Sequence, residues 1–266
     1  MRDLLNDLTE GLSHPDPILR AQLQMKKPQA KRFYTEVSVA GSGDSFEIRL
    51  DGRPVKTPAK NLLSVPTRAL ADLLAAEWDA QEKIIDPIRM PVTRLVNTAI
   101  DGVAQDTQVV FDDIVKFAGN DLLCYRAGEP QELVARQSAL WDPLLDWAAA
   151  TLGARFILIE GIIHRPQPEA AITAYAAVLQ KHHTALKLSC LHTITALTGS
   201  AILTLAFAEG RLTVAECWSL AHLEEDWTIE HWGSDDEADA RRAARFIEMQ
   251  AAADAFFALG AEDDAG

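Results

Sequence analysis

The chain has 266 residues, enough for one large domain or for two of ordinary size. Its 25 Lys and Arg residues against 39 Asp and Glu residues give a formal charge of −14, which argues against binding to nucleic acid or to anionic lipid surfaces. With 48% hydrophobic and 24% charged residues, the composition is that of a folded protein and excludes general disorder.

Residues 1–30 are expected to form a short helix followed by a linker. Leu4, Leu5, Leu8 and Leu12 have helical spacing, and two prolines then interrupt the pattern. The segment contains four acids and no long apolar run, which argues against a signal peptide and against an Arg-rich presequence. The three cysteines form no C-x-x-C pair, and an odd number suits a reducing compartment. These features predict a soluble intracellular protein.

An antiparallel sheet is predicted in the next part of the chain. Residues 32–40 alternate, with Phe33 on one side of the strand and Tyr34 on the other, and residues 46–50 have the same period. Asp51-Gly52 favours a two-residue type I′ turn into a third strand at 53–57, and residues 62–65 can add a fourth.

After Pro66 the hydrophobic period becomes helical, with Thr67 as the expected cap of the first helix. Further helices are predicted at 92–101, 106–118, 130–151, 168–186, 188–208, 212–232 and 235–259, and short strands at 122–126 and 155–159. The fold class is therefore α+β: a small antiparallel β-sheet domain at 31–127, followed by a mainly helical, orthogonal-bundle domain at 128–266.

The segment Leu188–Ala208 has no charged residue and approaches the length that spans a bilayer. It also contains seven Ser, Thr or His residues, which suit a helix buried in protein better than one in lipid. We therefore predict no membrane insertion and an interior helix that bends near Gly199.

The motifs of common catalytic and cofactor sites are missing from the sequence. There is no G-x-x-x-x-G-K-[ST] loop, no G-x-S-x-G elbow and no H-E-x-x-H motif. His222 and Glu225 are three residues apart and could both coordinate one metal ion, although such a pair is more often exposed to solvent. The cysteines lie in apolar surroundings and are expected to be inert core thiols. We predict no catalytic residue, no metal site and no cofactor.

The predicted helix 212–232 carries a carboxylate where an apolar residue is expected. On one continuous wheel, Glu225 projects within about 20° of Val214, in the same stripe as Cys217 and Trp218. A buried carboxylate costs several kcal/mol unless it is paired. Two interpretations remain open. An arginine from the run 241–245 neutralises Glu225 internally, or Glu225 and Glu224 receive a cationic group from a partner.

The end of this helix has its own signals. Gly233 is expected to take the left-handed conformation after Trp232. Ser234 with Glu237 is expected to form a capping box for the last helix.

The run Leu223-Glu224-Glu225-Asp226-Trp227, continuing to Trp232-Gly233, is unusual. With other segments, it resembles the assembly chaperones of F-type ATP synthase that attend the α subunit. The other segments are Arg32-Phe33-Tyr34, Leu50-Asp51-Gly52-Arg53, Lys56-Thr57-Pro58, Glu77-Trp78-Asp79-Ala80-Gln81, Thr93 to Asp101, Cys124-Tyr125-Arg126 and Trp141-Asp142-Pro143. The resemblance spans roughly residues 31–259, in order and at compatible spacing.

The resemblance implies an ATP-independent chaperone, not an enzyme, that binds the unassembled α subunit of F-type ATP synthase and promotes assembly of its catalytic head. It also implies a monomer and a functional acidic residue in the helical domain. Mitochondrial members of the family have a presequence, and since the sequence argues against one here, we expect a bacterial cytoplasmic location. We carry the partner-binding role to Glu224, Glu225, Asp226, Trp227 and Trp232. Two other functions are considered: an enzyme with a cleft around Glu224, Glu225 and His222, and a generic helical scaffold protein.

Overall fold

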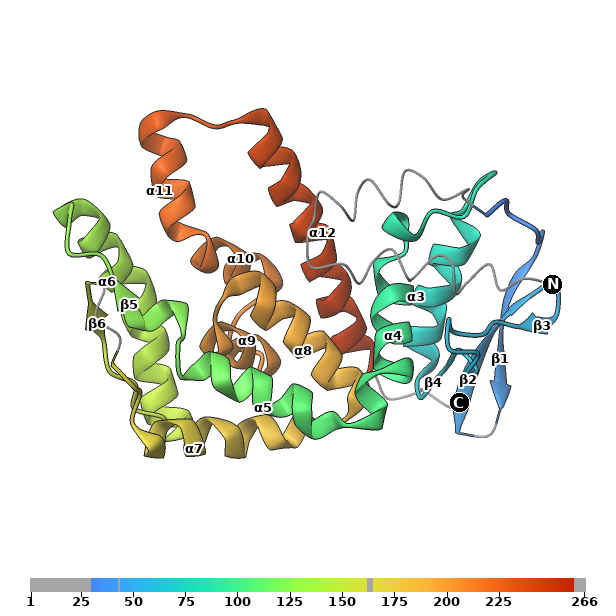
Figure 1. The fold of residues 1–266 in the computed structure, drawn as a ribbon, viewed down its shortest axis with the longest axis horizontal. Coiled ribbons are helices and arrows are strands. Elements are labelled where there is room, and N and C mark those ends of the chain that lie inside the picture. Colours follow the sequence, from blue (N-terminus) through green and yellow to red (C-terminus); the bar gives the residue numbers. More distant parts are fainter. Residues whose placement is uncertain (1–29, 43, 162–164, 261–266) are drawn as a thin grey trace. The chain divides into compact units, whose positions relative to one another are not determined.

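A computed structural model of the protein describes residues 30–42, 44–161 and 165–260. The described residues divide by their internal packing into two compact units, one within 30–105 together with 254–260 and one within 106–253 (Figure 1). The helix and linker predicted at the N-terminus fall outside the described residues, apart from Ala30. The predicted domain boundary after residue 127 stays a prediction.

The first unit contains the predicted antiparallel sheet. Its strands are β1 (Val37–Ser42), β2 (Ser45–Leu50), β3 (Arg53–Pro54) and β4 (Ser64–Val65). Strand β2 pairs with each of the other three, all antiparallel. The sheet is confirmed, with shorter outer strands than the alternation suggests.

The turn from β2 to β3 has the predicted geometry. Asp51 lies at φ 47° and Gly52 at φ 76°, so both central residues have the positive φ that a type I′ turn requires. The Asp51 carboxylate accepts hydrogen bonds from the backbone N–H groups of Thr35 and Glu36, and these lower its pKa. The turn therefore also fixes the chain just before β1.

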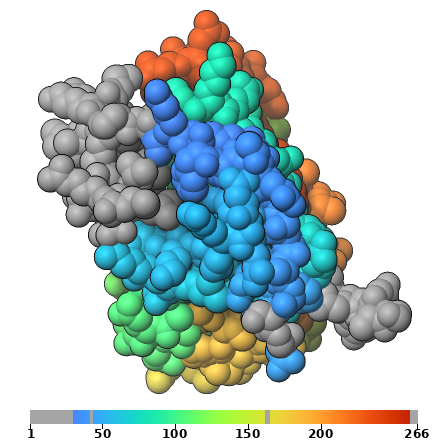
Figure 2. Space-filling view, turned by 90° about the vertical axis from the view of Figure 1, so that its right-hand side faces the viewer, coloured from blue at the N-terminus to red at the C-terminus, as the bar shows by residue number. Residues whose placement is uncertain are grey.

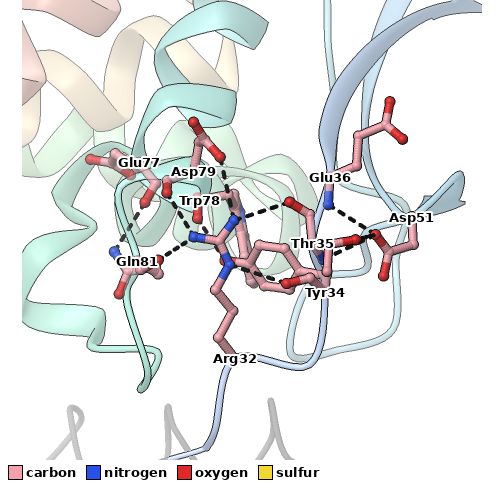
Figure 3. Close-up of polar contacts among 9 residues, drawn as sticks. All are labelled: Arg32, Tyr34, Thr35, Glu36, Asp51, Glu77, Trp78, Asp79 and Gln81. Carbon is pink, nitrogen blue, oxygen red and sulfur yellow. Dashed lines mark hydrogen bonds and ion pairs between the residues drawn. The ribbon is translucent and has the colours of Figure 1, made fainter.

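Thr35 and Glu36 are thus tied to the turn of the sheet, and the residues before them, Arg32 and Tyr34, are tied to the end of the helix that follows the sheet (Figure 3). The Arg32 guanidinium donates to the carbonyls of Asp79 and Gln81 and lies over the Tyr34 ring, 4.6 Å from its centroid. Tyr34 is buried and its hydroxyl donates to the Trp78 carbonyl at 2.6 Å. The strand predicted from residue 32 therefore starts only at Val37. Before that point Tyr34 points inward, and Phe33 is 64% exposed.

Helix α3 (Arg68–Asp79) packs on the sheet, and α4 (Pro91–Asp101) packs on α3. Thr67 caps α3 as predicted, since its hydroxyl accepts the backbone N–H of Leu70. The Glu77 carboxylate accepts the first two free N–H groups of α4, from Val92 and Thr93, each at 2.7 Å. In the space-filling view of Figure 2, the blue residues around the sheet and the cyan residues that follow them form one continuous surface.

The second unit is mainly helical, which confirms the predicted fold class. Its helices are α5 (Thr107–Ala118), α6 (Gln131–Trp147), α7 (Glu169–Leu179), α8 (Ala185–Thr198), α9 (Ala201–Ala208), α10 (Val214–Ala221), α11 (Leu223–Trp232) and most of α12 (Asp236–Ala258). The two predicted short strands shrink to a parallel pair, β5 (Tyr125–Arg126) and β6 (Ile159–Glu160).

The long helix predicted at 188–208 is two helices. Gly199 adopts φ 69°, ψ 12°, a left-handed conformation that ends α8, and the Ser200 hydroxyl then caps α9 by accepting the N–H of Leu203. The predicted bend is therefore a complete break. No helix in the described part of the chain combines the length and hydropathy needed to cross a bilayer.

The break is organised around a fully buried carboxylate. Asp121 accepts hydrogen bonds from the hydroxyl of Ser200 at 2.8 Å, the N–H of Ile202 at 2.8 Å and the N–H of Leu123 at 3.0 Å. These contacts join the residues after α5 to the first turn of α9. Burial raises the pKa of Asp121 to about 6 against the opposing effect of these hydrogen bonds.

The three cysteines are buried, in agreement with their expected role as core thiols. Burial raises the pKa of Cys190 and of Cys217 to about 12 and that of Cys124 as well, so all three stay protonated at neutral pH.

The raised pKa of Asp121 predicts a stability contribution that falls as the pH rises. The ordinary value is 3.8, so between pH 3.8 and about 6 the folded protein holds a proton that the unfolded chain has released. The contribution is complete below pH 3.8 and is lost, by about 3 kcal/mol, above pH 6. Urea unfolding of the wild type and of Asp121→Asn between pH 4 and 7 should show the difference in unfolding free energy shrinking by about that amount.

The other carboxylates are common to both proteins, so their titration cancels in the difference between the two unfolding free energies. Asp72→Asn, at an exposed position of α3, controls for the loss of one charge. A difference between wild type and Asp121→Asn that stays constant or widens with pH would contradict the assignment.

Candidate functional site

The helix predicted at 212–232 is broken at His222 into α10 and α11, which run in different directions (Figure 1). His222 lies outside helical geometry at φ −106°, ψ 19°, and its ring is buried against Trp218 with centroids 3.8 Å apart. A single wheel over both helices is therefore wrong. Cys217 and Trp218 are buried residues of α10, and Glu225 lies on a different helix, so the three do not form one helix face.

Two acids of α11 bind α6. The Glu224 carboxylate accepts a hydrogen bond from the Gln137 amide at 2.5 Å. Glu230 forms a bidentate ion pair with Arg136, at 2.6 and 2.9 Å, and this contact lowers the pKa of Glu230. Both contacts join residues about ninety positions apart in the chain, so they fix α11 against α6.

A third acid binds α12. Asp226 forms an ion pair with Arg242 at 2.6 Å. Of the neighbouring arginines, Arg241 pairs with Glu237 inside α12, and Arg245 donates to the Leu197 carbonyl. The interpretation in which one of these three arginines neutralises Glu225 is therefore wrong, because the arginine nearest to α11 binds Asp226.

Glu225 differs from the other three acids of α11. Its side chain is 42% exposed, and its closest cationic candidate is the ring of His222 at 4.0 Å. Burial lowers the pKa of His222, so the imidazole is mostly neutral at pH 7. Glu225 is therefore partly open to solvent, and among the described residues no Lys or Arg forms an ion pair with it.

The exposed side of α11 continues from Glu225 toward the C-terminal end of the helix. Thr228, Ile229 and Trp232 follow at the spacing that places them on the same face. Trp232 is 71% exposed. Its ring meets the half-buried Trp227 edge to face, with centroids 5.3 Å apart. We call Glu225, Thr228, Ile229 and Trp232 the outer face of α11.

The opposite side of α11 holds the helix in place with little burial. Leu223 is the one buried residue of this helix, all of which is described.

Gly233 ends α11 at φ 86°, ψ 169°, a positive φ as expected but not the left-handed helical conformation. Asp235, and not Ser234, caps α12, since its carboxylate accepts the N–H of Ala238 at 2.9 Å.

The structure sorts the five predicted partner-binding residues into two groups. Glu224 and Asp226 face α6 and α12 and bind side chains there, and Trp227 is half-buried. Glu225 and Trp232 are on the outer face. Sequence reasoning missed Arg136 and Gln137, which position α11, because no local pattern links α6 to a helix so much later in the chain.

The geometry gives little support to a catalytic cleft at Glu224, Glu225 and His222. Glu224 is occupied by Gln137, and His222 is packed on Trp218. Two hollows of about 530 and 460 Å³ lie elsewhere, along α5, and share Asp112 and Lys116 in their linings. Among the described residues, no three His, Cys, Asp or Glu side chains are grouped to hold a metal ion.

Comparison with known proteins gives consistent results. The family model described as "ATP12 chaperone protein" matches residues 31–149. The crystal structure of the Atu1473 protein from Agrobacterium tumefaciens has 62% sequence identity and a TM-score of 0.87, over 97% of each chain. That of Atp12 from Paracoccus denitrificans has 36% identity and a TM-score of 0.81, over 86% of this chain and 98% of its own. The mitochondrial protein atp12 of Schizosaccharomyces pombe is 23% identical over 238 residues, which cover 82% of this chain and 79% of that protein.

The weak burial of α11 predicts that its local stability depends on its ion pairs. In Arg136→Ala/Arg242→Ala, each lost pair should cost about 0.5–1 kcal/mol, so amide hydrogens of α11 should exchange about 5- to 30-fold faster. Hydrogen exchange measured by mass spectrometry should show this change in α11 and little change in α8.

Arg241→Ala is the matched control, because it removes an exposed ion pair that lies within α12 alone. Equal exchange of α11 in the double variant and in the wild type would show that other contacts hold the helix.

Proposed function

The chain belongs to the ATP12 chaperone family, and we propose on that premise that it binds the unassembled α subunit of F-type ATP synthase and promotes assembly of the catalytic head. The proposed activity is that of a binding protein that hydrolyses no nucleotide. The observation that carries it is the outer face of α11, where a partly exposed acid that pairs with no described Lys or Arg and a largely exposed tryptophan lie on one helix.

A chaperone for a subunit interface must cover apolar surface and later release it. A few anchoring side chains in a polar surround suit this task, because buried area alone does not set affinity. The outer face of α11 has this composition, with Trp232 and Ile229 beside Glu225 and Thr228. Such a surface binds a partner without forming a permanent interface.

The distribution of charge also supports a binding role for the second unit. Residues 106–253 contain 11 Lys and Arg and 21 Asp and Glu, a net charge of −10. Such a field keeps a complex with an aggregation-prone client in solution and attracts a client edge that is positively charged. The same field disfavours self-association, which supports the proposal that the free protein is a monomer.

The alternative of an enzyme finds no support in the comparisons, since the matching family model is described as a chaperone and the Atu1473 protein as "a putative chaperone". A generic scaffold role predicts capture of proteins other than the α subunit. A bacterial cytoplasmic location is part of the proposal, and the identity to two bacterial proteins supports it.

We expect co-expression with the α subunit of the same organism to raise the soluble fraction of that subunit. Glu225→Lys should reduce this effect about fivefold or more, because it places a like charge where a client cation is expected. The soluble α subunit is measured by quantitative immunoblot after centrifugation. Thermal unfolding of Glu225→Lys should match that of the wild type, since Glu225 is exposed.

Asp146→Lys makes the same charge change at an exposed position near the end of α6 and should leave the soluble fraction unchanged. An α subunit that is equally soluble with and without the protein would overturn the proposed function.

A further inference from the structure

The outer face of α11 is left free by the way the helix is anchored. Leu223 is buried, and Glu224, Asp226 and Glu230 bind α6 and α12. These residues occupy the inner side of the helix and its two flanks. The fold therefore orders the helix without using its outer face.

At one end of the outer face, Glu225 forms no ion pair with a Lys or Arg of the described neighbourhood. The segment 223–248, which covers α11 and the first half of α12, has three arginines and nine acids, a net charge of −6. Arg242, the arginine that contacts α11 from α12, is engaged by Asp226, and Arg136 on α6 is engaged by Glu230. A cation that approaches Glu225 from outside would therefore meet an attractive field with no competing internal partner.

The other end of the outer face presents a largely exposed tryptophan. Trp232 is 71% exposed, and its edge-to-face contact with Trp227 restricts its ring. Ile229 lies one turn before it and is half-buried. A restricted exposed indole loses little conformational entropy on binding, which is the property of an anchoring residue.

The distance between these two ends sets the geometry of a matching ligand. Glu225 and Trp232 are seven residues apart on one helix, which corresponds to about 10 Å along its axis. A second helix carries side chains at the same separation on one of its faces, at positions i and i+7.

We propose that the outer face of α11 docks a cationic amphipathic helical segment of the client, with a Lys or Arg against Glu225 and an apolar side chain against Trp232 and Ile229. The client is that of the proposed function, on which this inference rests. A second copy of the chain is the less favoured occupant, because each copy would bring the same acidic segment to the interface.

The test uses the full-length protein and a fluorescein-labelled 15-residue amphipathic peptide of leucine, alanine and lysine, with binding measured by fluorescence anisotropy. A matched peptide with glutamate in place of every lysine controls for apolar content. The lysine peptide should bind and the glutamate peptide should bind at least tenfold more weakly. Glu225→Gln and Trp232→Ala should each weaken binding of the lysine peptide about five- to tenfold.

Position-specific controls separate this site from the general attraction of an acidic protein for a cation. Glu237→Gln removes an exposed acid of α12 that is not on the outer face and should change binding less than twofold. Equal effects of Glu225→Gln and Glu237→Gln, or no effect of Trp232→Ala, would overturn the inference. A dimer in sedimentation equilibrium that Trp232→Ala dissociates would also overturn it in favour of self-association.

The outcome is independent of the co-expression test. If the α subunit is solubilised while the lysine peptide binds without dependence on Glu225 and Trp232, the inference fails and the proposed function stands. If the peptide binds as expected while the α subunit is unaffected, the proposed client is wrong and the docking surface stands.

Discussion

Helix α11 is held against α6 and α12 by two ion pairs and a hydrogen bond. Of its ten residues, all described, Leu223 alone is buried, so these polar contacts carry most of its attachment. Most helices of a globular protein are held by an apolar face that packs on the core. In α11 the acids Glu224, Asp226 and Glu230 take over that task. This use of charge leaves Trp232 largely exposed on an ordered helix.

The contrast with the buried acid of the same unit is instructive. Asp121 is surrounded by protein and satisfied by three donors, and it joins α5 to α9 as a structural element. Glu225 lies at the surface, without a comparable set of donors, beside an exposed tryptophan. Two carboxylates in unusual surroundings thus have different meanings, and burial together with hydrogen bonding distinguishes a structural acid from one available to a partner.

Local signals in the sequence predicted what depends on local geometry. The Asp51-Gly52 turn, the Thr67 cap and the α+β order follow from residues close together in the chain. The break at His222 could not be predicted in this way, since neither glycine nor proline marks it. The pairing of Arg136 with Glu230 is also tertiary. The wheel therefore identified Glu225 as unusual for a reason that was partly wrong, while its position on the outer face emerged only from the structure.

Gly233 gives the short connection between α11 and α12 its direction. At φ 86°, ψ 169° it occupies a region of backbone conformation that is essentially restricted to glycine. A methyl group at this position would meet no atom within 4 Å, so the restriction comes from the backbone itself and not from crowding. The direction in which α11 leads into α12 thus depends on a residue without a side chain. Such a determinant of helix orientation is invisible to any account that considers side-chain contacts alone.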